Sequence, residues 1–272
     1  MNRRKNRKVF SGKLMVFAAV VAAAIMPLTL AVPVCLAADL PSAEEVIEDY
    51  IEATGGREAY AKIENIMTTG KFEMPSQGIV MNITSYSARP NLMYAVIESP
   101  QLGKMERGIS REGVAWENSM MTGPSIKEGK EKQQMLDDAL IDKMVRWKEV
   151  YSKAENMGIE NVDGKECYKV VFTTKNGSTE TLYFEKESGL LVKTERTIHS
   201  QMGEIQSAVS IKDYRETDGI LTSYLTEVSL MGQTRKITIE KIETNIEFPD
   251  TLFDLPEEIK SLMEKKKEAE TE

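Results

Sequence analysis

The alternation of apolar and polar positions divides most of the chain into short strands. Ile79, Met81 and Ile83, for example, alternate with Asn82 and Thr84. Turn residues separate such runs, and Asn176-Gly177 is a strong signal for a two-residue hairpin turn. The pattern predicts an antiparallel meander with strands at 68–74, 79–86, 92–98, 104–110, 114–118, 168–174, 179–185, 190–198, 205–214, 220–230 and 234–243.

Three segments have helical spacing instead. Ser42 and Glu45 form a capping box that starts a first helix, and Gly55-Gly56 ends it. A second short helix is predicted at 57–63. The third is predicted at 130–151, because one apolar stripe recurs at intervals of three and four residues. That stripe contains Leu136, Leu140, Met144 and Trp147.

This inventory predicts a mainly β (α+β) fold. About ten strands in series need curvature or closure to avoid exposed edges. We therefore expect a single curved antiparallel sheet that forms a half-open β-barrel, with the helices as a lid over one opening.

The N-terminal segment is typical of an export signal. Six basic residues and no acidic ones precede residue 14, and an uncharged apolar run follows from Leu14 to Leu36. Small residues at Cys35 and Ala37 fit the −3 and −1 positions of a cleavage site. The predicted organisation is a signal peptide at 1–37, one domain at 38–256, and a charged, disordered or helical tail at 257–272.

Two alternatives remain for this leader. The apolar run is long enough to span a bilayer, so residues 14–36 could stay as an inner-membrane anchor. Cys35 could instead be a lipidated cysteine, although Val32-Pro33-Val34 before it is a poor match to such sites. The favoured location is the periplasm, and membrane contact is expected only if the N-terminal segment is not cleaved.

Charge excludes one class of partner. Loss of the leader removes six positive and no negative charges, which changes the net charge from −8 to about −14. A chain this acidic repels phosphate backbones, so nucleic acid is not an expected partner.

Catalytic chemistry is poorly supported. His199 is the only histidine, which excludes zinc sites built on paired histidines, and next to Ser200 it is interpreted as a turn residue. No phosphate-binding glycine loop occurs, and the acidic pairs Asp137-Asp138 and Glu44-Glu45 are interpreted as solvated helix faces. Cys167 lies in a strand-like run and is expected to be a buried apolar residue. We predict no catalytic residue, no metal and no cofactor.

Methionine is enriched, with 13 residues after the leader. Its flexible, polarizable side chain suits either ordinary core packing or a cavity for variable apolar ligands. If a cavity exists, the candidate lining residues on strands and on the third helix are Phe72, Met74, Met81, Trp116, Leu136, Leu140 and Met144.

Several short motifs occur in a fixed order along residues 42–256. They are Ala53-Thr54-Gly55-Gly56, Gly113-Val114-Ala115-Trp116-Glu117, Gly164-Lys165-Glu166-Cys167-Tyr168-Lys169-Val170, Ser188-Gly189-Leu190-Leu191, Asp213-Tyr214-Arg215 and Phe248-Pro249-Asp250-Thr251-Leu252-Phe253-Asp254-Leu255-Pro256. With the export signal, this order resembles periplasmic proteins of the outer-membrane lipoprotein-sorting (Lol-carrier-like) superfamily. The resemblance implies a half-open barrel, a lid of helices and a hydrophobic cavity for acyl chains. It also implies an arginine that latches the lid, for which Arg107 and Arg89 are the candidates.

The leading hypothesis is therefore a non-enzymatic periplasmic protein that binds a lipid or lipoprotein acyl chain, for transport or sorting in the envelope. The alternative is an envelope interaction module that uses its sheet surface for a protein partner and holds no small ligand. A third hypothesis, a hydrolase that uses two carboxylates, requires a deep polar cleft.

Overall fold

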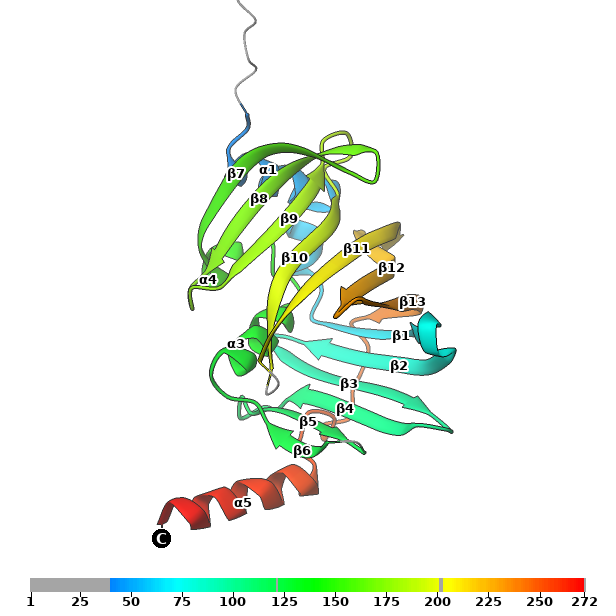
Figure 1. Ribbon diagram of the computed structural model, residues 1–272, viewed down its shortest axis with the longest axis vertical. Helices are drawn as coiled ribbons and strands as arrows, with labels where there is room; N and C mark the ends of the chain where they lie inside the picture. The colour runs from blue at the N-terminus through cyan, green and yellow to red at the C-terminus, as the bar shows by residue number, and fades with distance from the viewer. Residues whose placement is uncertain (1–39, 121, 201–202, 272) are drawn as a thin grey trace, which may run out of the picture. The chain divides into compact units, whose positions relative to one another are not determined.

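The computed structural model describes residues 40–120, 122–200 and 203–271 (Figure 1). They belong to one compact unit, Asp39–Glu272. The predicted signal peptide, its cleavage after Ala37 and the apolar run Leu14–Leu36 lie outside the described residues. None of the helices in the described ranges has the length and apolar character needed to cross a membrane.

Helices form a minor part of the fold. Ser42 and Glu45 make both hydrogen bonds of the predicted capping box at the start of the first helix. The helices are α1 (Ala43–Ala53), α2 (Gly56–Ala61), α3 (Gly129–Asp138), α4 (Trp147–Val150) and α5 (Glu257–Thr271), with a 3-10 turn η1 at Pro75–Gln77.

One antiparallel sheet contains all the strands of the described residues. These are β1 (Asn65–Met74), β2 (Ile79–Ala88), β3 (Leu92–Ser99), β4 (Gly103–Ile109), β5 (Ala115–Ser119), β6 (Gly123–Ile126), β7 (Tyr151–Val162), β8 (Lys165–Thr174), β9 (Thr179–Glu185), β10 (Leu191–Ser200), β11 (Gly203–Thr217), β12 (Ile220–Leu230) and β13 (Gln233–Thr244). Their order is β6-β5-β4-β3-β2-β1-β13-β12-β11-β10-β9-β8-β7. The sheet is open, because β6 and β7 each pair on one side only.

The sheet therefore consists of two meanders joined at its centre. The first runs from β1 outward to β6, and the second runs from β7 inward to β13, where β13 pairs with β1. A single connection, residues 127–150, leads from one edge of the sheet to the other. We call residues 129–150, which include α3 and α4, the crossing segment.

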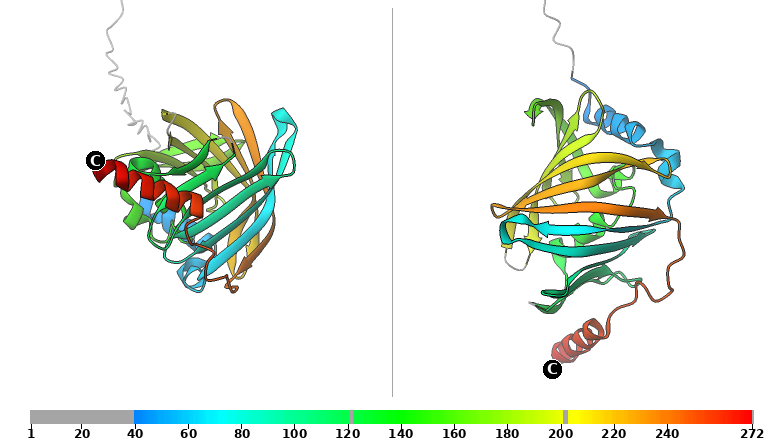
Figure 2. Two further views of the ribbon diagram at one scale, coloured as in Figure 1. Left: turned by 90° about the horizontal axis from the view of Figure 1, so that it is seen from below. Right: turned by 90° about the vertical axis from the view of Figure 1, so that its right-hand side faces the viewer.

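The crossing segment lies between the two ends of a bent sheet. Helix α3 contacts both β5 and β10, which are eight positions apart in the strand order. A flat sheet could not bring these strands to the same helix, so the sheet bends around α3 (Figures 1 and 2). We call the sheet face towards α1, α2 and α3 the inner face.

Three separate clusters of buried side chains hold the helices on the inner face. The largest joins Ile47 and Ile51 of α1 to Val170, Phe172 and Phe184 of β8 and β9. A second joins Tyr60 of α2 to Ile63 and Ile220. A third joins Ile109 and Ala115 of β4 and β5 to Ala139, next to α3.

The opposite, outer face carries a chain of aromatic rings. Tyr86 stacks on Tyr94 at 6.0 Å between ring centroids, and Tyr94 lies 6.2 Å from Trp116. Phe248 contacts Tyr86 edge-on at 5.5 Å and Phe253 at 5.9 Å. The closing segment after β13 therefore covers the outer face of β2–β5.

The structure corrects the prediction of one helix at 130–151. Helix α3 ends at Asp138, turns follow, and α4 has only four residues before β7 begins. The apolar stripe serves two targets: Leu136 packs against the cluster of Ile109, whereas Leu140, Met144 and Trp147 pack against the cluster of Phe172. One straight helix cannot face both clusters, so the segment breaks between them.

The strand count also differs, with thirteen strands in the described residues instead of about ten. Neither β6 nor β7 was predicted as a strand. Both are edge strands, and β7 has irregular register at Asn156/Ile159, which obscures its alternation. The tail takes the helical alternative as α5, where Ile259 is fully buried and Lys266 pairs with Glu128.

Candidate functional site

The centre of the inner face is a surface of apolar side chains. Phe72 of β1 lies directly opposite Met81 of β2 and Ile237 of β13. Ile83 is opposite Ile97 of β3. Side chains opposite each other on paired strands share a face, so these residues form continuous rows across the sheet.

This surface is only partly covered. Phe72, Ile83, Ile97 and Ile237 are half-buried, and none of them belongs to the three clusters that pack the helices. Val228 on β12 is also half-buried. We call these residues, with Met81, the central apolar surface. Its half-buried side chains remain accessible to an apolar ligand, whereas Met81 is 7% exposed.

Arg89, in the turn after β2, ties three parts of the fold together. Its Nε donates to the carbonyl of Ile63 at 2.8 Å and its Nη2 to the carbonyl of Tyr60 at 2.9 Å. Its Nη1 donates to Oδ2 of Asp142, in the crossing segment, at 2.8 Å. Asp142 is 7% exposed, so this pair is largely shielded from water.

A second group of charges holds the crossing segment at the other side. Asp138, the last residue of α3, accepts two hydrogen bonds from Arg196 of β10, at 2.7 and 2.8 Å. Lys143 lies 3.3 Å from Asp138 and 3.4 Å from Glu180, which accepts a 2.6 Å hydrogen bond from Tyr151. Desolvation raises the pKa of Asp138, but the charges of Arg196 and Lys143 outweigh it and lower this pKa to about 2.

Comparison with known proteins supports a fold assignment and no closer relationship. No protein-family model and no curated protein sequence matches the chain. Solved structures do match, at low sequence identity. A DUF1329 family protein of Desulfovibrio piger aligns with a TM-score of 0.55 and 14% identity, covering 78% of this chain and 97% of that one.

Two further crystal structures that align with this chain belong to LolA-type proteins. A LolA superfamily protein of Nitrosomonas europaea has a TM-score of 0.52 and 11% identity, covering 79% of this chain and 99% of that one. A putative outer-membrane lipoprotein-sorting protein domain of Vibrio parahaemolyticus has a TM-score of 0.51 and 10% identity, covering 76% and 97%. The chain has the LolA-type fold. The resemblance read from the sequence motifs is confirmed as a likeness of fold.

The LolA-type fold brings some of the predicted lining residues together. Phe72 and Met81 are directly opposite each other, and Met74 is two residues further along β1, on the same face. The helical candidates divide between clusters: Leu136 lies beside Ile109, and Leu140 and Met144 lie beside Phe172.

Trp116 is placed on the other face. Its neighbour Ala115 packs towards the crossing segment, so alternation directs Trp116 outward, where it lies against Tyr94. A Cβ at Gly108, directly across from Trp116, would lie 2.9 Å from the indole ring. Trp116 therefore belongs to the outer aromatic chain.

The two latch candidates are also distinguished. Arg89 makes the contacts described above, whereas Arg107 of β4 makes no hydrogen bond or ion pair with any residue that the structure describes. Arg89 was a candidate only through the family resemblance, and nothing in the sequence pointed to its partner Asp142, which lies in the segment that was predicted to be one helix.

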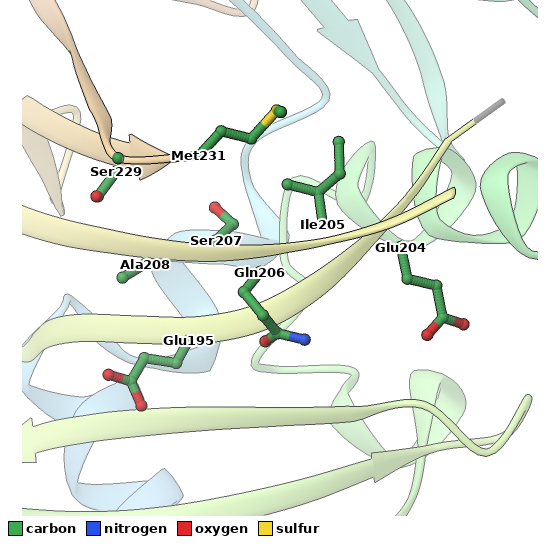
Figure 3. A pocket seen from close by; sticks show the side chains of 9 residues that line it. Glu195, Glu204, Ile205, Gln206, Ser207, Ala208, Ser229 and Met231 are labelled. Atoms are coloured by element: carbon green, nitrogen blue, oxygen red, sulfur yellow. The ribbon is translucent and has the colours of Figure 1, made fainter. Parts of the chain in front are cut away.

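A pocket of about 730 Å³ lies at one rim of the sheet, where β11 extends past the β12–β13 turn (Figure 3). Ile205 and Ser207 point to one side of β11, and Glu204 and Gln206 point to the other. The lining therefore comes from both faces. The lining residues are Glu195, Glu204, Ile205, Gln206, Ser207, Ala208, Ser229, Met231 and Gly232.

His199 occurs in an arrangement that sequence reasoning did not find. Its Nε2 lies 3.0 Å from Oγ of Ser178, and its Nδ1 lies 3.4 Å from Oε1 of Glu204. This order matches that of a Ser-His-acid triad. However, the backbone N–H groups of Gly177 and Ser178 already donate to Thr174 within the turn, so they do not form an oxyanion hole. We interpret the trio as a hydrogen-bonded turn.

Cys167 is fully buried, and burial raises the pKa of its thiol. It therefore behaves as the small apolar residue that its strand context predicted. Among residues 40–120, 122–200 and 203–271, no group of three or more His, Cys, Asp or Glu side chains could hold a metal ion.

Proposed function

We propose that this protein binds the acyl chain of a lipid or lipoprotein against the inner face of its bent sheet, as a non-enzymatic component of the bacterial cell envelope. The bent sheet is the half-open barrel of this proposal, and the crossing segment is its lid. In this role the protein would transport or sort the molecule that it binds.

The central apolar surface carries the proposal. Apolar side chains such as Phe72, Ile83 and Ile237 are only partly buried on a face that bends around α3. Each methylene of a ligand that is transferred from water to such a surface contributes about 0.8 kcal/mol. Ten methylenes therefore contribute roughly 8 kcal/mol, before the entropic costs of association are subtracted.

The latch role belongs to Arg89 in this proposal. Its hydrogen bonds join the end of α2, through the Tyr60 and Ile63 carbonyls, to Asp142 of the crossing segment. A ligand that needs the space beneath the crossing segment has to break this contact. Arg89 therefore couples ligand entry to lid movement, and Arg107 does not share this role.

The N-terminal sequence supports a location outside the cytoplasm. The basic stretch, the apolar run and the small residues before Ala38 are the pattern that signal peptidase recognises. N-terminal sequencing of the protein from the envelope fraction tests this, and a start at Ala38 is the expected result. Retention of residues 14–36 would make the protein a tethered receptor.

Native mass spectrometry of protein purified in mild detergent tests the binding function. We expect a co-purified apolar ligand in the wild-type protein. Ile237→Asn, on the central apolar surface, should lower its occupancy about tenfold, since it puts a polar group where the chain lies. Val80→Asn is the matched control, because Val80 is 55% exposed and, next to Met81, points to the outer face.

A protein that is always empty and binds no acyl chain in titration would overturn the proposal. That result would favour the alternative, in which a sheet surface binds an envelope protein. Equal loss of ligand in the two variants would place the binding site elsewhere.

A further inference from the structure

Arg235 is a charged residue on an otherwise apolar part of the inner face. It lies directly opposite Val228 of β12, and Val228 lies opposite Val209 of β11. Along β13 the next residue on the same face is Ile237, opposite Phe72. Alternation thus places a guanidinium at one end of the rows that form the central apolar surface.

This guanidinium has no partner among the residues that the structure describes. Of the eight arginines among the described residues, six make hydrogen bonds, ion pairs or ring contacts: Arg57, Arg89, Arg111, Arg146, Arg196 and Arg215. Arg107 and Arg235 make none with the described residues. Arg107 is exposed to solvent, whereas Arg235 is half-buried among apolar neighbours. An unpaired cation that is partly removed from water favours a bound anion.

Ser207 is a second unsatisfied polar group on the same face. Its side chain is buried, at 5% exposed, and its Oγ has no hydrogen-bond partner in the described part of the chain. Ser207 lies opposite Leu230 of β12, which is two residues beyond Val228, the residue opposite Arg235. Ser207 and Arg235 are therefore two strands and two residues apart. Regular sheet spacing puts their Cα atoms about 12 Å apart. Figure 3 shows Ser207 pointing to the same side of β11 as Ile205.

These groups together define one end of a binding site. A guanidinium donates two parallel hydrogen bonds to a phosphate or a carboxylate, and a hydroxyl adds a third donor. The two acidic side chains of the nearby pocket, Glu195 and Glu204, lie on the opposite face. Glu195 is next to Arg196, which lies opposite Ser207, so alternation directs Glu195 outward. Glu204 points to the other side of β11 from Ser207. An anion held by Arg235 and Ser207 would therefore lie on the inner face, away from these two carboxylates.

We propose that the ligand is an anionic amphiphile, whose phosphate or carboxylate head lies between Arg235 and Ser207 and whose acyl chain extends over Ile237, Phe72 and Met81. This inference rests on the proposed acyl-chain binding and adds the chemistry of the head group. The net charge of about −14 after loss of the leader repels anions in general, so a local cation is needed to admit one.

Paired ligands that differ only in head-group charge test this inference in the purified protein. Palmitate is compared with methyl palmitate, and lysophosphatidylglycerol with monopalmitoylglycerol, by displacement of a neutral fluorescent apolar probe. The wild-type protein should bind each charged ligand about tenfold more tightly than its neutral counterpart, as expected for one charge-assisted pair. A preference confined to one pair identifies the head as carboxylate or phosphate.

Arg235→Gln should remove this preference and leave the affinity for the neutral ligands unchanged. Ser207→Ala should weaken only the charged ligands, about threefold, since it removes one neutral donor. Arg215→Gln is the matched control, because Arg215 is exposed and pairs with Asp213. In the wild-type protein, the preference should also decrease with added salt, a measurement that needs no variant.

Equal affinity of the wild-type protein for charged and neutral ligands would overturn the inference and leave acyl-chain binding intact. Persistence of the preference in Arg235→Gln, with neutral binding unchanged, would also overturn it. If neither the neutral nor the charged ligands displace the probe, the proposed function itself fails.

Discussion

The two halves of the inner face differ in how they are packed. Over β8 and β9, Phe172, Val170 and Phe184 are at most 1% exposed beneath α1 and the crossing segment. Over β1, β2 and β13, apolar residues of equal size such as Phe72 and Ile237 are left half-buried. Both surfaces have the same alternating pattern, but only the first is filled by the protein's own side chains.

The difference in packing suggests that one half of the inner face stabilises the fold and that the other half is suited to bind a ligand. A filled surface contributes its burial free energy to folding, whereas an unfilled one retains that free energy for a ligand. The crossing segment joins the two, because Trp147 and Met144 pack on the filled side while Asp142 is held by Arg89 near the open side. Variants that separate the two halves test this interpretation directly.

The largest expected effect is on the filled half. Phe172→Ala should lower the free energy of unfolding by about 3–5 kcal/mol, since it leaves a cavity beside Tyr151 and Trp147. Phe72→Ala should cost less, about 2 kcal/mol, because its ring is only partly buried, and should mainly weaken ligand binding. Urea unfolding measures both, and equal losses would contradict the comparison.

The next effect concerns the latch. Arg89→Gln leaves the buried Asp142 with only Arg146, 3.7 Å away, and should lower stability by about 2 kcal/mol, less than for a fully buried pair since Arg89 is 25% exposed. Hydrogen exchange of residues 139–146 should accelerate. Arg215→Gln, at an exposed pair, should change stability by less than about 0.5 kcal/mol. Unchanged exchange in Arg89→Gln would exclude a latch.

A smaller effect depends on pH at the other attachment of the crossing segment. Because folding lowers the pKa of Asp138 to about 2, its charge stabilises the fold above about pH 4, and this contribution is lost as the pH falls towards 2. After allowance for partial exposure of the carboxylate, about 1 kcal/mol is expected. Other carboxylates with lowered pKa values also lose stability in acid, so urea unfolding at pH 5 and pH 2.5 should show a loss that is about 1 kcal/mol smaller in Asp138→Asn than in the wild-type protein.

Asp137 is the control for this experiment, because burial raises its pKa. Its contribution has the opposite sign: the fold gains stability from this group as it becomes protonated. Asp137→Asn should therefore make the loss on acidification larger. A smaller loss in Asp137→Asn than in the wild-type protein would show that the two carboxylates have been assigned wrongly.

The smallest effect is expected at His199. Ser178→Ala removes one hydrogen bond at a turn and should change stability by about 0.5–1 kcal/mol, with no change in ligand binding. Incubation of the wild-type protein with a nitrophenyl ester should give no hydrolysis above that of Ser178→Ala. Ester turnover that disappears in Ser178→Ala would instead identify a working triad.

Local patterns predicted the regular elements well. The capping box of Ser42 and Glu45, the Asn176-Gly177 turn and most strands depend on interactions within a few residues, and the structure confirms them. The pairing of Phe72 with Met81 follows from the same alternation across one short turn.

Features that depend on distant parts of the chain were not predictable. The stripe from Leu136 to Trp147 has helical spacing, but its two ends pack on clusters from opposite ends of the sheet. The face of Trp116 depends on which side of β5 the crossing segment covers. Arg235 is recognised as an unpaired, half-buried cation only once the partners of the other arginines in the described residues are known, because of those eight only Arg107 is also unpaired and Arg107 is exposed.

The pairing of β1 with β13 has a consequence for the order in which the protein can be assembled. Ile66 lies opposite Thr244, so the two meanders join only after nearly the whole chain is available. Pairing over such a sequence separation is slow and comes late. The rows that contain Phe72 and Ile237 therefore do not exist in an incomplete chain. An incomplete chain therefore cannot load the proposed ligand, and any capacity to bind it arises in the same step that completes the sheet.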